Sequence, residues 1–386
     1  MKILKAYKYR IYPNKTQKVL LAKTFGCVRY FWNNQVSVFN SYNKETNPTP
    51  QYKTSTEIRN AIDWFKEVSA AAIQQKEIDF KQYKNQKFSK TRNGSVGYPS
   101  FKKKSNKQSY RLPNQKFKLI NNKIQLEKIG KVSIVIDREI PINSKYMSAT
   151  ISMNCSGQYF VSILVEQEAN KLPKTNKEVG VDVGLKEFAT LSDGLTILNP
   201  RYFRESQTKL AKIQKYHSRK QKGSNRRKKS RKKIARLHQQ ISNQRDWFLQ
   251  TESTKMVKNY DVICIEDLHV SGMLKNHKLA KSISDVSFSK FFNLLEYKCV
   301  WYGKELIKIG RFEPSSKMCS KCGNVKKELK LSDRVYICDV CGHTEDRDLN
   351  ASKNIKALGV NNAIRTQSNE VTNCDEAFMV ESNKIL

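Results

Sequence analysis

Asp182 is the first residue of this sequence whose type and setting suggest chemistry. It lies within "VGVDVG" (179–184), an apolar run typical of a buried strand. An ionised carboxylate in an apolar interior is costly unless it is paired or holds a metal ion. Alternation along the strand places Gly180, Asp182 and Gly184 on one face, where two absent side chains leave room for a bulky neighbour. We therefore expect a distant segment to supply a partner for Asp182.

Two later acidic sites are candidates for that partner. Glu266 and Asp267 end the apolar stretch "DVICIEDL" (261–268), and Asp346 and Asp348 precede a predicted helix. Each site alone is ambiguous, because acids at such positions also cap helices. Their order along the chain matches the ribonuclease H fold, which gathers carboxylates at the ends of adjacent strands. Three such acids would hold two divalent ions and orient a water for in-line attack on a phosphodiester.

A second metal site is indicated by cysteine spacing. Cys319 and Cys322 form one C-x2-C knuckle, and Cys338 and Cys341 form another. Two knuckles at this separation suit one tetrahedral zinc, and four thiolates leave that ion no open position for chemistry. We expect a structural zinc ribbon over 319–341, with disulfides disfavoured by the intracellular composition. His343 follows too closely to be an obvious fifth ligand, and the five scattered cysteines are interpreted as packing thiols.

The charge of the chain points to an anionic partner. Its 386 residues contain 72 Lys and Arg against 35 Asp and Glu, a net charge of +37. This imbalance favours nucleic acid. Within "RKQKGSNRRKKSRKK" (219–233), ten of fifteen residues are basic, and "SFKKKSNKQSYR" (100–111) is a second such segment. A solvated, disordered loop is the alternative for the longer run, but the global charge favours phosphate contacts. The candidate contacts are Arg226, Arg227, Lys228, Lys229, Arg231, Lys232, Lys102, Lys103 and Lys104.

The elements expected to carry these residues form an α+β multidomain chain. Period-two alternation over 5–12 predicts a strand, Asn14 and Gln17 predict a capping box, and helical patterns follow to about residue 40 and over 55–85. Strands then return, with hairpin turns at Asn121-Asn122, Ser156-Gly157 and Asp193-Gly194. We expect a small β-barrel from 1–12 and 96–172 with residues 13–95 inserted as a helical lobe. A helical region over 203–258 is expected to be interrupted by the basic run at 219–233.

Membrane insertion is not expected. The longest apolar runs, such as "VSIVI" (132–136), have strand length, and the lysine-rich N-terminus lacks an apolar core of the signal-peptide kind. We expect a cytoplasmic protein.

Several of these stretches together resemble a known family. "KAYKYRIYPNKTQ", "KGSNRRKKSRKKIARLHQQISNQRDWF", "VICIEDLHVSGM" and "CSKCGNVKK…YICDVCGHTEDRDLNASKNI" are similar to TnpB, the insertion-sequence protein regarded as ancestral to type V CRISPR effectors. The resemblance extends from residue 1 to about 358. It implies a RuvC-like ribonuclease H domain over 173–318 and 342–365, interrupted by the ribbon. It also implies that the barrel is wedge-like and that the helical lobe supports a guide–target duplex. The tail over 366–386 matches nothing in the family and is expected to be disordered.

The activity that this resemblance implies is RNA-guided cleavage of double-stranded DNA beside a short transposon-associated motif. The catalytic acids of the family carry over to Asp182, Glu266 and Asp348, which would bind two Mg²⁺ ions. Asp348 is preferred to Asp346 because related nucleases place the acid directly before a helix that continues with small residues; here "NAS" replaces the usual "NAA". The implied partners are a guide RNA from the transposon end and target DNA, bound by a monomer in the prokaryotic nucleoid.

Three other functions are compatible with parts of the sequence. A catalytically silent, RNA-guided DNA-binding regulator would share the basic surface and ribbon, but it would not need all three acids. A DNA-strand-transferring transposase could use the same acids, although it has less need of so large an RNA-facing charge. An actin-like ATPase also begins with a "GVDVG"-type strand, but it has no reason for a zinc ribbon.

Overall fold

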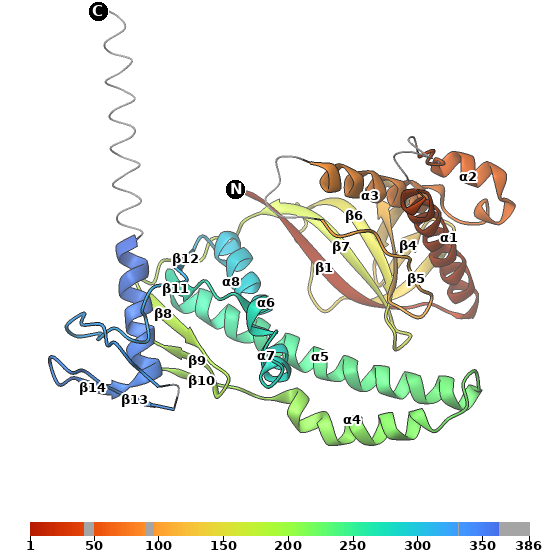
Figure 1. The fold of residues 1–386 in the computed structure, drawn as a ribbon. Helices are drawn as coiled ribbons and strands as arrows, with labels where there is room; N and C mark the ends of the chain where they lie inside the picture. The colour runs from red at the N-terminus through yellow and green to blue at the C-terminus, as the bar shows by residue number, and fades with distance from the viewer. Residues whose placement is uncertain (42–49, 90–95, 331, 363–386) are drawn as a thin grey trace, which may run out of the picture. The chain divides into compact units, whose positions relative to one another are not determined.

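The computed structural model describes residues 1–41, 50–89, 96–330 and 332–362, in which the chain folds as two compact units (Figure 1). The first unit contains Met1–Glu168 together with Gly223–Arg236, and the second contains Ala169–Lys222 and the chain from Leu237 onward. Each unit has its own sheet and its own apolar core. The predicted tail over 366–386 lies outside the described residues.

The first unit is built on a seven-stranded antiparallel sheet. Its strands are β1 (Lys2–Tyr12), β2 (Gln108–Pro113), β3 (Phe117–Ile120), β4 (Lys123–Leu126), β5 (Gly130–Val135), β6 (Lys145–Met153) and β7 (Tyr159–Glu168). Their order is β2-β6-β7-β1-β5-β4-β3. The two edge strands, β2 and β3, are consecutive in the chain and joined by the single 3-10 turn η2 (Asn114–Lys116). The sheet therefore curls until its edges meet, which gives a nearly closed barrel.

The strand that alternation predicted over 5–12 is part of β1, which joins the later strands in this barrel. It pairs with β7 from Lys2 opposite Glu168 to Ile11 opposite Tyr159, and with β5 at its far end. Tyr7, Tyr9 and Ile11 are buried in the barrel core, whereas Lys8 faces solvent. The segment between β1 and β2 is therefore an insertion outside the barrel sheet, and it contains helices.

Those helices are α1 (Lys15–Asn40), α2 (Ser55–Ala61), the 3-10 turn η1 (Asp63–Phe65) and α3 (Ala70–Phe88). The predicted capping box at the start of α1 is present, because Gln17 N donates to Asn14 Oδ1 at 2.8 Å and Asn14 N donates to Gln17 Oε1 at 3.0 Å. The pattern over 55–85 is not one helix, since Ile62 adopts an extended conformation and ends α2. The break allows Phe65 and Ile73 to pack against Phe31 of α1 in a small separate core.

The second unit contains a five-stranded sheet in the order β10-β9-β8-β11-β12. Its strands are β8 (Glu178–Val183), β9 (Glu187–Leu191), β10 (Thr196–Leu198), β11 (Val262–Glu266) and β12 (Glu305–Ile309). Strands β8, β11 and β12 are parallel, β9 pairs antiparallel with β8, and β10 pairs antiparallel with β9. Gly194, at φ +91°, occupies the predicted turn between β9 and β10. The helices are α4 (Tyr202–Ser218), α5 (Asn225–Asn259), α6 (Val270–Met273), α7 (Ala280–Val286), α8 (Phe288–Tyr302) and a last helix over 347–362. Helix α5 belongs to this unit from Leu237 onward and to the first unit before it.

Helices cover both faces of this second sheet (Figure 1). Val179 and Val181 of β8 pack in one core with Leu249 of α5 and Phe291 of α8. The opposite face of β8 meets the helix over 347–362 so closely that a Cβ on Gly180 would lie 2.0 Å from the Ser352 carbonyl oxygen. The bulky neighbour expected beside Asp182 is therefore a helix.

The long basic run was wrongly predicted as an interruption of the helical region. Helix α4 ends at Ser218 and α5 begins at Asn225, so only 219–224 form the connection. The remaining residues of the run lie in the first turns of α5. Lys and Arg are good helix formers, and the run contains one glycine, Gly223, in the connecting turn. Periodicity of apolar residues could not reveal this part of the helix because it contains none.

Candidate metal centres

Asp182 and Glu266 lie beside each other at the carboxyl ends of adjacent parallel strands. The register pairs Val181 of β8 with Ile265 of β11, so the residues that follow each of them occupy neighbouring positions, with strands about 4.8 Å apart. Val181 and Ile265 both point into the apolar core. Asp182 and Glu266 consequently project from the opposite face, towards the helix over 347–362. Both residues are half-buried.

The two aspartates of the third acidic site differ in their hydrogen bonds and in their exposure to solvent. Asp346 is exposed, and its Oδ1 accepts hydrogen bonds from the backbone N–H of Asp348 at 2.9 Å and of Leu349 at 3.1 Å. Those are the bonds of an N-cap residue. Asp348 is half-buried in the first helical turn, where its side chain is not needed for capping. The close approach at Gly180 fixes this helix against the strand that carries Asp182.

Electrostatics connect the three predicted acids. Burial raises the pKa of Asp182 well above its ordinary value, and the neighbouring carboxylates of Glu266 and then Asp348 raise it further, whereas Arg347 acts in the opposite direction. Mutual repulsion of this kind favours a cation between the carboxylates, and carboxylate oxygens are the ligands that Mg²⁺ prefers. Glu266 and Asp348 thus both act on the charge of Asp182. The catalytic role of the three acids stays a prediction.

The two acids at the end of β11 also contact residues of the segment that follows β12. Asp267 forms an ion pair with Arg311, with 2.6 Å between the carboxylate and guanidinium atoms. Glu266 accepts a hydrogen bond at Oε1 from the hydroxyl of Ser315. No local pattern marks Ser315 in the sequence, because it lies 49 residues from Glu266 and belongs to the segment that enters the ribbon. The three acids are not drawn together as tightly as the cysteines described next.

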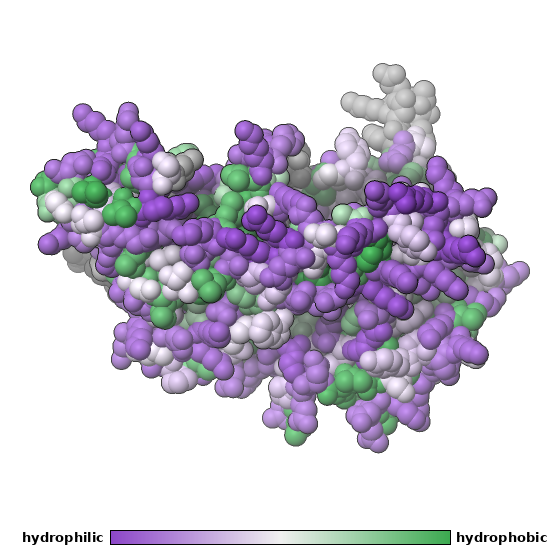
Figure 2. Space-filling model, turned by 90° about the horizontal axis from the view of Figure 1, so that it is seen from below, coloured by the Kyte–Doolittle hydropathy of each residue, from purple (hydrophilic) through white to green (hydrophobic). Residues whose placement is uncertain are grey.

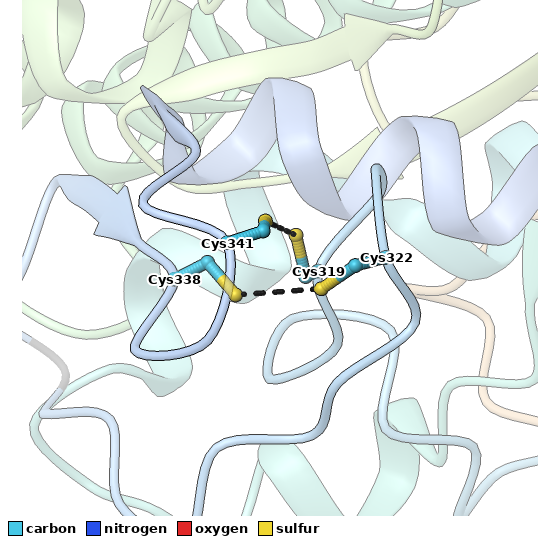
Figure 3. A group of neighbouring side chains, drawn as sticks. All are labelled: Cys319, Cys322, Cys338 and Cys341. Atoms are coloured by element: carbon cyan, nitrogen blue, oxygen red, sulfur yellow. Dashed lines mark hydrogen bonds between the residues drawn. The ribbon is translucent and has the colours of Figure 1, made fainter.

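The four predicted zinc ligands converge on one point (Figure 3). Their sulfur atoms all lie within 4.8 Å of one another, and they form the only such group of His, Cys, Asp or Glu side chains in the described residues. The Sγ–Sγ distances are 3.7 Å from Cys319 to Cys341 and 3.5 Å from Cys322 to Cys338. A tetrahedral zinc with Zn–S bonds of about 2.3 Å separates its sulfurs by about 3.8 Å. The donor set and its spacing therefore fit a structural zinc.

Backbone geometry builds both knuckles in the same way. Gly323 N donates to Cys319 O at 2.9 Å, Gly342 N donates to Cys338 O at 3.1 Å, and each glycine has a positive φ, +76° and +69°. Backbone N–H groups of Cys341 and Val340 point at the Cys338 sulfur and lower the pKa of that thiol to about 6. At Cys338 this favours the thiolate, the form that binds zinc, whereas hydrogen bonds with Cys341 and the other thiols raise the pKa of Cys322 to about 12. The short strands β13 (Val335–Ile337) and β14 (Thr344–Asp346) connect the second knuckle to the rest of the ribbon.

The predicted phosphate-binding residues lie in two places. Six of them, Arg226, Arg227, Lys228, Lys229, Arg231 and Lys232, occur in the first two turns of α5. Lys102, Lys103 and Lys104 lie in an irregular segment before β2, where Lys102 Nζ sits 4.1 Å from the centroid of the Trp32 ring. Desolvation and the nearby Lys76 lower the pKa of Lys102 to about 8. Their contact with nucleic acid stays a prediction.

The visible surface is predominantly hydrophilic. Figure 2 shows polar and charged residues over most of one face, with apolar residues in small separated patches. Across the described part of the chain, no helix combines the length and the hydrophobicity needed to cross a bilayer.

Comparison with protein families identifies three matching segments. A model of the IS605 OrfB type, described as "Probable transposase", matches residues 162–277, and a model described as "Cas12f1-like, TNB domain" matches residues 288–355, which include the four cysteines. A third, described as a helix-turn-helix domain of OrfB IS605, matches residues 1–46. In this structure the described residues of that last segment form β1 and α1.

Two curated relatives match over nearly their whole lengths. A protein of Streptomyces pristinaespiralis named "Putative RNA-guided DNA endonuclease" is 36% identical over 370 residues, which cover 93% of this chain and 90% of the relative. InsQ of Escherichia coli K12, which carries the same name, is 31% identical over 387 residues and 93% of each chain. Among solved structures, Cas12f1 in a complex with sgRNA and target DNA matches with a TM-score of 0.55 over 92% of this chain and 99% of that chain. At 12% identity, this last likeness concerns the fold.

Proposed function

The chain belongs to the TnpB family of the IS605 OrfB type, and from this premise we propose that it is an RNA-guided DNA endonuclease of transposon origin. The observation that carries the proposal is the meeting of Asp182, Glu266 and Asp348 from two strand ends and a helix start. Carboxylates with this placement suit a nuclease that uses divalent metal ions. Carboxylates held close together repel one another and lower stability, and a protein that only binds DNA would not need such a cluster.

The three acids would hold two Mg²⁺ ions. Such ions, when bound, supply an activated water and stabilise the leaving oxygen of an in-line phosphodiester displacement. Burial, and after it the charges of Glu266 and Asp348, raise the pKa of Asp182, and a bound cation would favour its ionised form. Strand register fixes Glu266 beside Asp182, and the cap provided by Asp346 fixes the helical turn that presents Asp348. Arg347 limits the negative charge of the centre and would help to orient a phosphate beside it.

The fold of the second unit supports a RuvC-like ribonuclease H domain. Its sheet has three neighbouring parallel strands, β8, β11 and β12, with an antiparallel hairpin beside β8, and acids stand at the carboxyl ends of β8 and β11. The inserted ribbon would bind one zinc ion and lack catalytic chemistry, since its four thiolates complete a tetrahedron. The barrel of the first unit would then be the wedge-like domain and its helices the lobe that supports the guide–target duplex.

Two nucleic acids are proposed as partners: a guide RNA from the transposon end and double-stranded target DNA. The net charge of +37 supports binding of a large polyanion. Base pairing with the guide would select the target, and the protein would read only a short motif beside it. We propose that one chain acts on one guide RNA, in the nucleoid where its DNA target lies.

The test is guide-dependent cleavage. RNA that copurifies with the chain is sequenced, its guide segment is replaced to match a plasmid, and the plasmid is incubated with the complex in Mg²⁺. Cutting beside one short motif, lost when guide bases next to that motif are mismatched, is the expected result. Target-specific cutting by RNA-free protein would instead support the transposase or a generic nuclease. Guide-dependent binding without cutting would support the silent regulator.

A further inference from the structure

Ser315 lies outside the sequence-predicted site but touches one of its acids. It is 3% exposed and sits four residues before Cys319, on the segment that leads from β12 into the ribbon. Its hydroxyl donates to Oε1 of Glu266. Oε2 of Glu266 accepts no hydrogen bond from any described residue, so that oxygen can face a cation. A hydroxyl in this position restricts the rotation of the Glu266 carboxylate without adding charge to the centre.

Two buried asparagines hold the backbone that carries Ser315. Asn354 is 1% exposed, and its Nδ2 donates to the carbonyl oxygens of Ser315 at 2.8 Å and of Met318 at 2.6 Å. Asn350 is fully buried; its Nδ2 donates to Met318 O at 2.7 Å, and its Oδ1 accepts from Ser320 N at 2.9 Å. The two asparagines are four residues apart, and therefore lie on one face of the helix over 347–362. Buried amides that bond the backbone in this way favour one conformation, because a shift of the segment would leave a buried polar group unpaired.

We propose that Ser315 is a positioning residue of the nuclease centre, whose hydroxyl orients Glu266 while Asn350 and Asn354 hold the segment that presents it. This inference rests on the proposed function and extends it. One helix then sets two features of the centre: Asp348 in its first turn and, through Ser315, the orientation of Glu266. The ribbon that begins at Cys319 stabilises the far end of the same segment. Zinc binding is thus connected to cleavage without zinc entering the reaction.

The first experiment compares three variants of the full chain loaded with its guide RNA. Ser315→Ala removes the hydroxyl, Ser315→Thr keeps it, and Ser316→Ala makes the same deletion at the next residue. Loss of a group that orients a metal ligand typically costs 10- to 100-fold in metal affinity or activity. We expect Ser315→Ala to raise the Mg²⁺ concentration for half-maximal cleavage by about that factor. Ser315→Thr and Ser316→Ala should stay within about threefold of the original chain, with one zinc in each variant.

A second readout does not require cleavage. Mn²⁺ is titrated into the RNA-free chain and its binding is followed by electron paramagnetic resonance, with Asp182→Ala as the reference for loss of the acidic site. Ser315→Ala should weaken the Asp182-dependent binding by about tenfold, and Ser315→Thr should not. If the original chain never cleaves DNA but Ser315→Ala still weakens Mn²⁺ binding, the nuclease proposal fails and the positioning role stands. If Ser315→Ala matches Ser316→Ala in both assays, the positioning role is refuted.

The role of the two asparagines, which we call the clamp, is tested by Asn354→Asp. This change keeps the side-chain shape but replaces the Nδ2 donor by an acceptor that faces two carbonyl oxygens. Asn361→Asp makes the same change at an exposed position of the same helix. We expect Asn354→Asp, but not Asn361→Asp, to raise the Mg²⁺ requirement as Ser315→Ala does. An unchanged Mg²⁺ requirement would overturn the clamp. Should Asn354→Asp fail to fold, the Ser315 variants still decide whether the hydroxyl positions Glu266.

Discussion

Asp346 and Asp348 are two residues apart, yet their surroundings give them different chemistry. Asp346 Oδ1 accepts hydrogen bonds from two backbone N–H groups at the start of the last helix, and this cap stabilises the helix. Asp348 is half-buried, and its charge raises the pKa of Asp182. Only the hydrogen bonds therefore distinguish which aspartate of this motif is the N-cap and which is the candidate metal ligand.

The two aspartates should respond differently to removal. Asp348→Ala is expected to reduce cleavage to the background of the assay while guide RNA and target binding persist, as are Asp182→Ala and Glu266→Ala, because each removes a metal ligand. Asp346→Ala should keep cleavage and lower the free energy of unfolding by about 1 kcal/mol, the usual cost of losing an N-cap. Cleavage by plasmid nicking and unfolding by urea measure the two effects. An inactive Asp346→Ala beside an active Asp348→Ala would reverse the assignment.

Lys298 in α8 predicts a pH dependence of stability. It is 4% exposed, donates to Gln250 O, Ser253 Oγ and Thr254 Oγ1, and desolvation lowers its pKa to about 8. Between pH 8 and about 10, the unfolded chain keeps this proton while the folded chain loses it, so folding becomes more favourable as pH rises. Relative to Lys298→Met, the original chain should gain on the order of 1–2 kcal/mol over this range.

Urea unfolding at pH 7.5 and pH 9.5 measures this difference. Other groups titrate in the same range, but they are shared by both chains and cancel in the comparison. Lys258→Met, on an exposed position of α5, is the matched control and should show no such change. A difference between the original chain and Lys298→Met that does not depend on pH would contradict the assignment.

Elements were predictable from the sequence where the signal was local. The turns at Asn121, Gly157 and Gly194 adopt positive φ, and they separate the strands that alternation had indicated. The alternation around Asp182 also predicted that one face of β8 had space for a neighbour. The neighbour is the helix over 347–362, with Ser352 against Gly180. Its identity depends on tertiary packing and cannot be predicted from a short stretch of sequence. Ser315 and Asn354 escaped prediction for the same reason, since their bonds join segments 39 and 49 residues apart.

The ribbon is the element with the most direct test. Purified chain in reducing, chelator-free buffer should contain about one zinc per molecule, and Cys338→Ser should lose it together with the fold of 319–341, because zinc binding energy is also folding energy. Metal analysis and hydrogen exchange of the ribbon measure the two losses. Cys155→Ser, an exposed cysteine outside the ribbon, should retain the metal. A zinc content near zero in the unaltered chain would end this interpretation.

At the scale of the whole molecule, net charge is the property that could be predicted most directly from the sequence. The chain carries 72 Lys and Arg against 35 Asp and Glu, and two of the basic segments, the first turns of α5 and the segment before β2, both belong to the first compact unit. Composition was therefore sufficient to indicate a nucleic-acid partner. It could not indicate which surface binds RNA and which binds DNA, because a phosphate contact has the same chemistry on either.

The α5 charges make a quantitative prediction about salt. Each lysine that neutralises a DNA phosphate releases condensed counterions, which contributes about −0.9 to the slope of log affinity against log salt concentration. Binding of the chain to a duplex of unrelated sequence should therefore weaken by about 10³-fold or more between 50 and 200 mM salt. If Lys228, Lys229 and Lys232 each contact a phosphate, replacing all three with Gln should make the slope shallower by about 2.7. Gln at Lys321, an exposed residue of the ribbon, is the control and should change the slope by at most about 0.9. Fluorescence anisotropy with a labelled duplex at five salt concentrations gives the slopes, and an unchanged slope in the triple variant would remove the start of α5 from the DNA-binding surface.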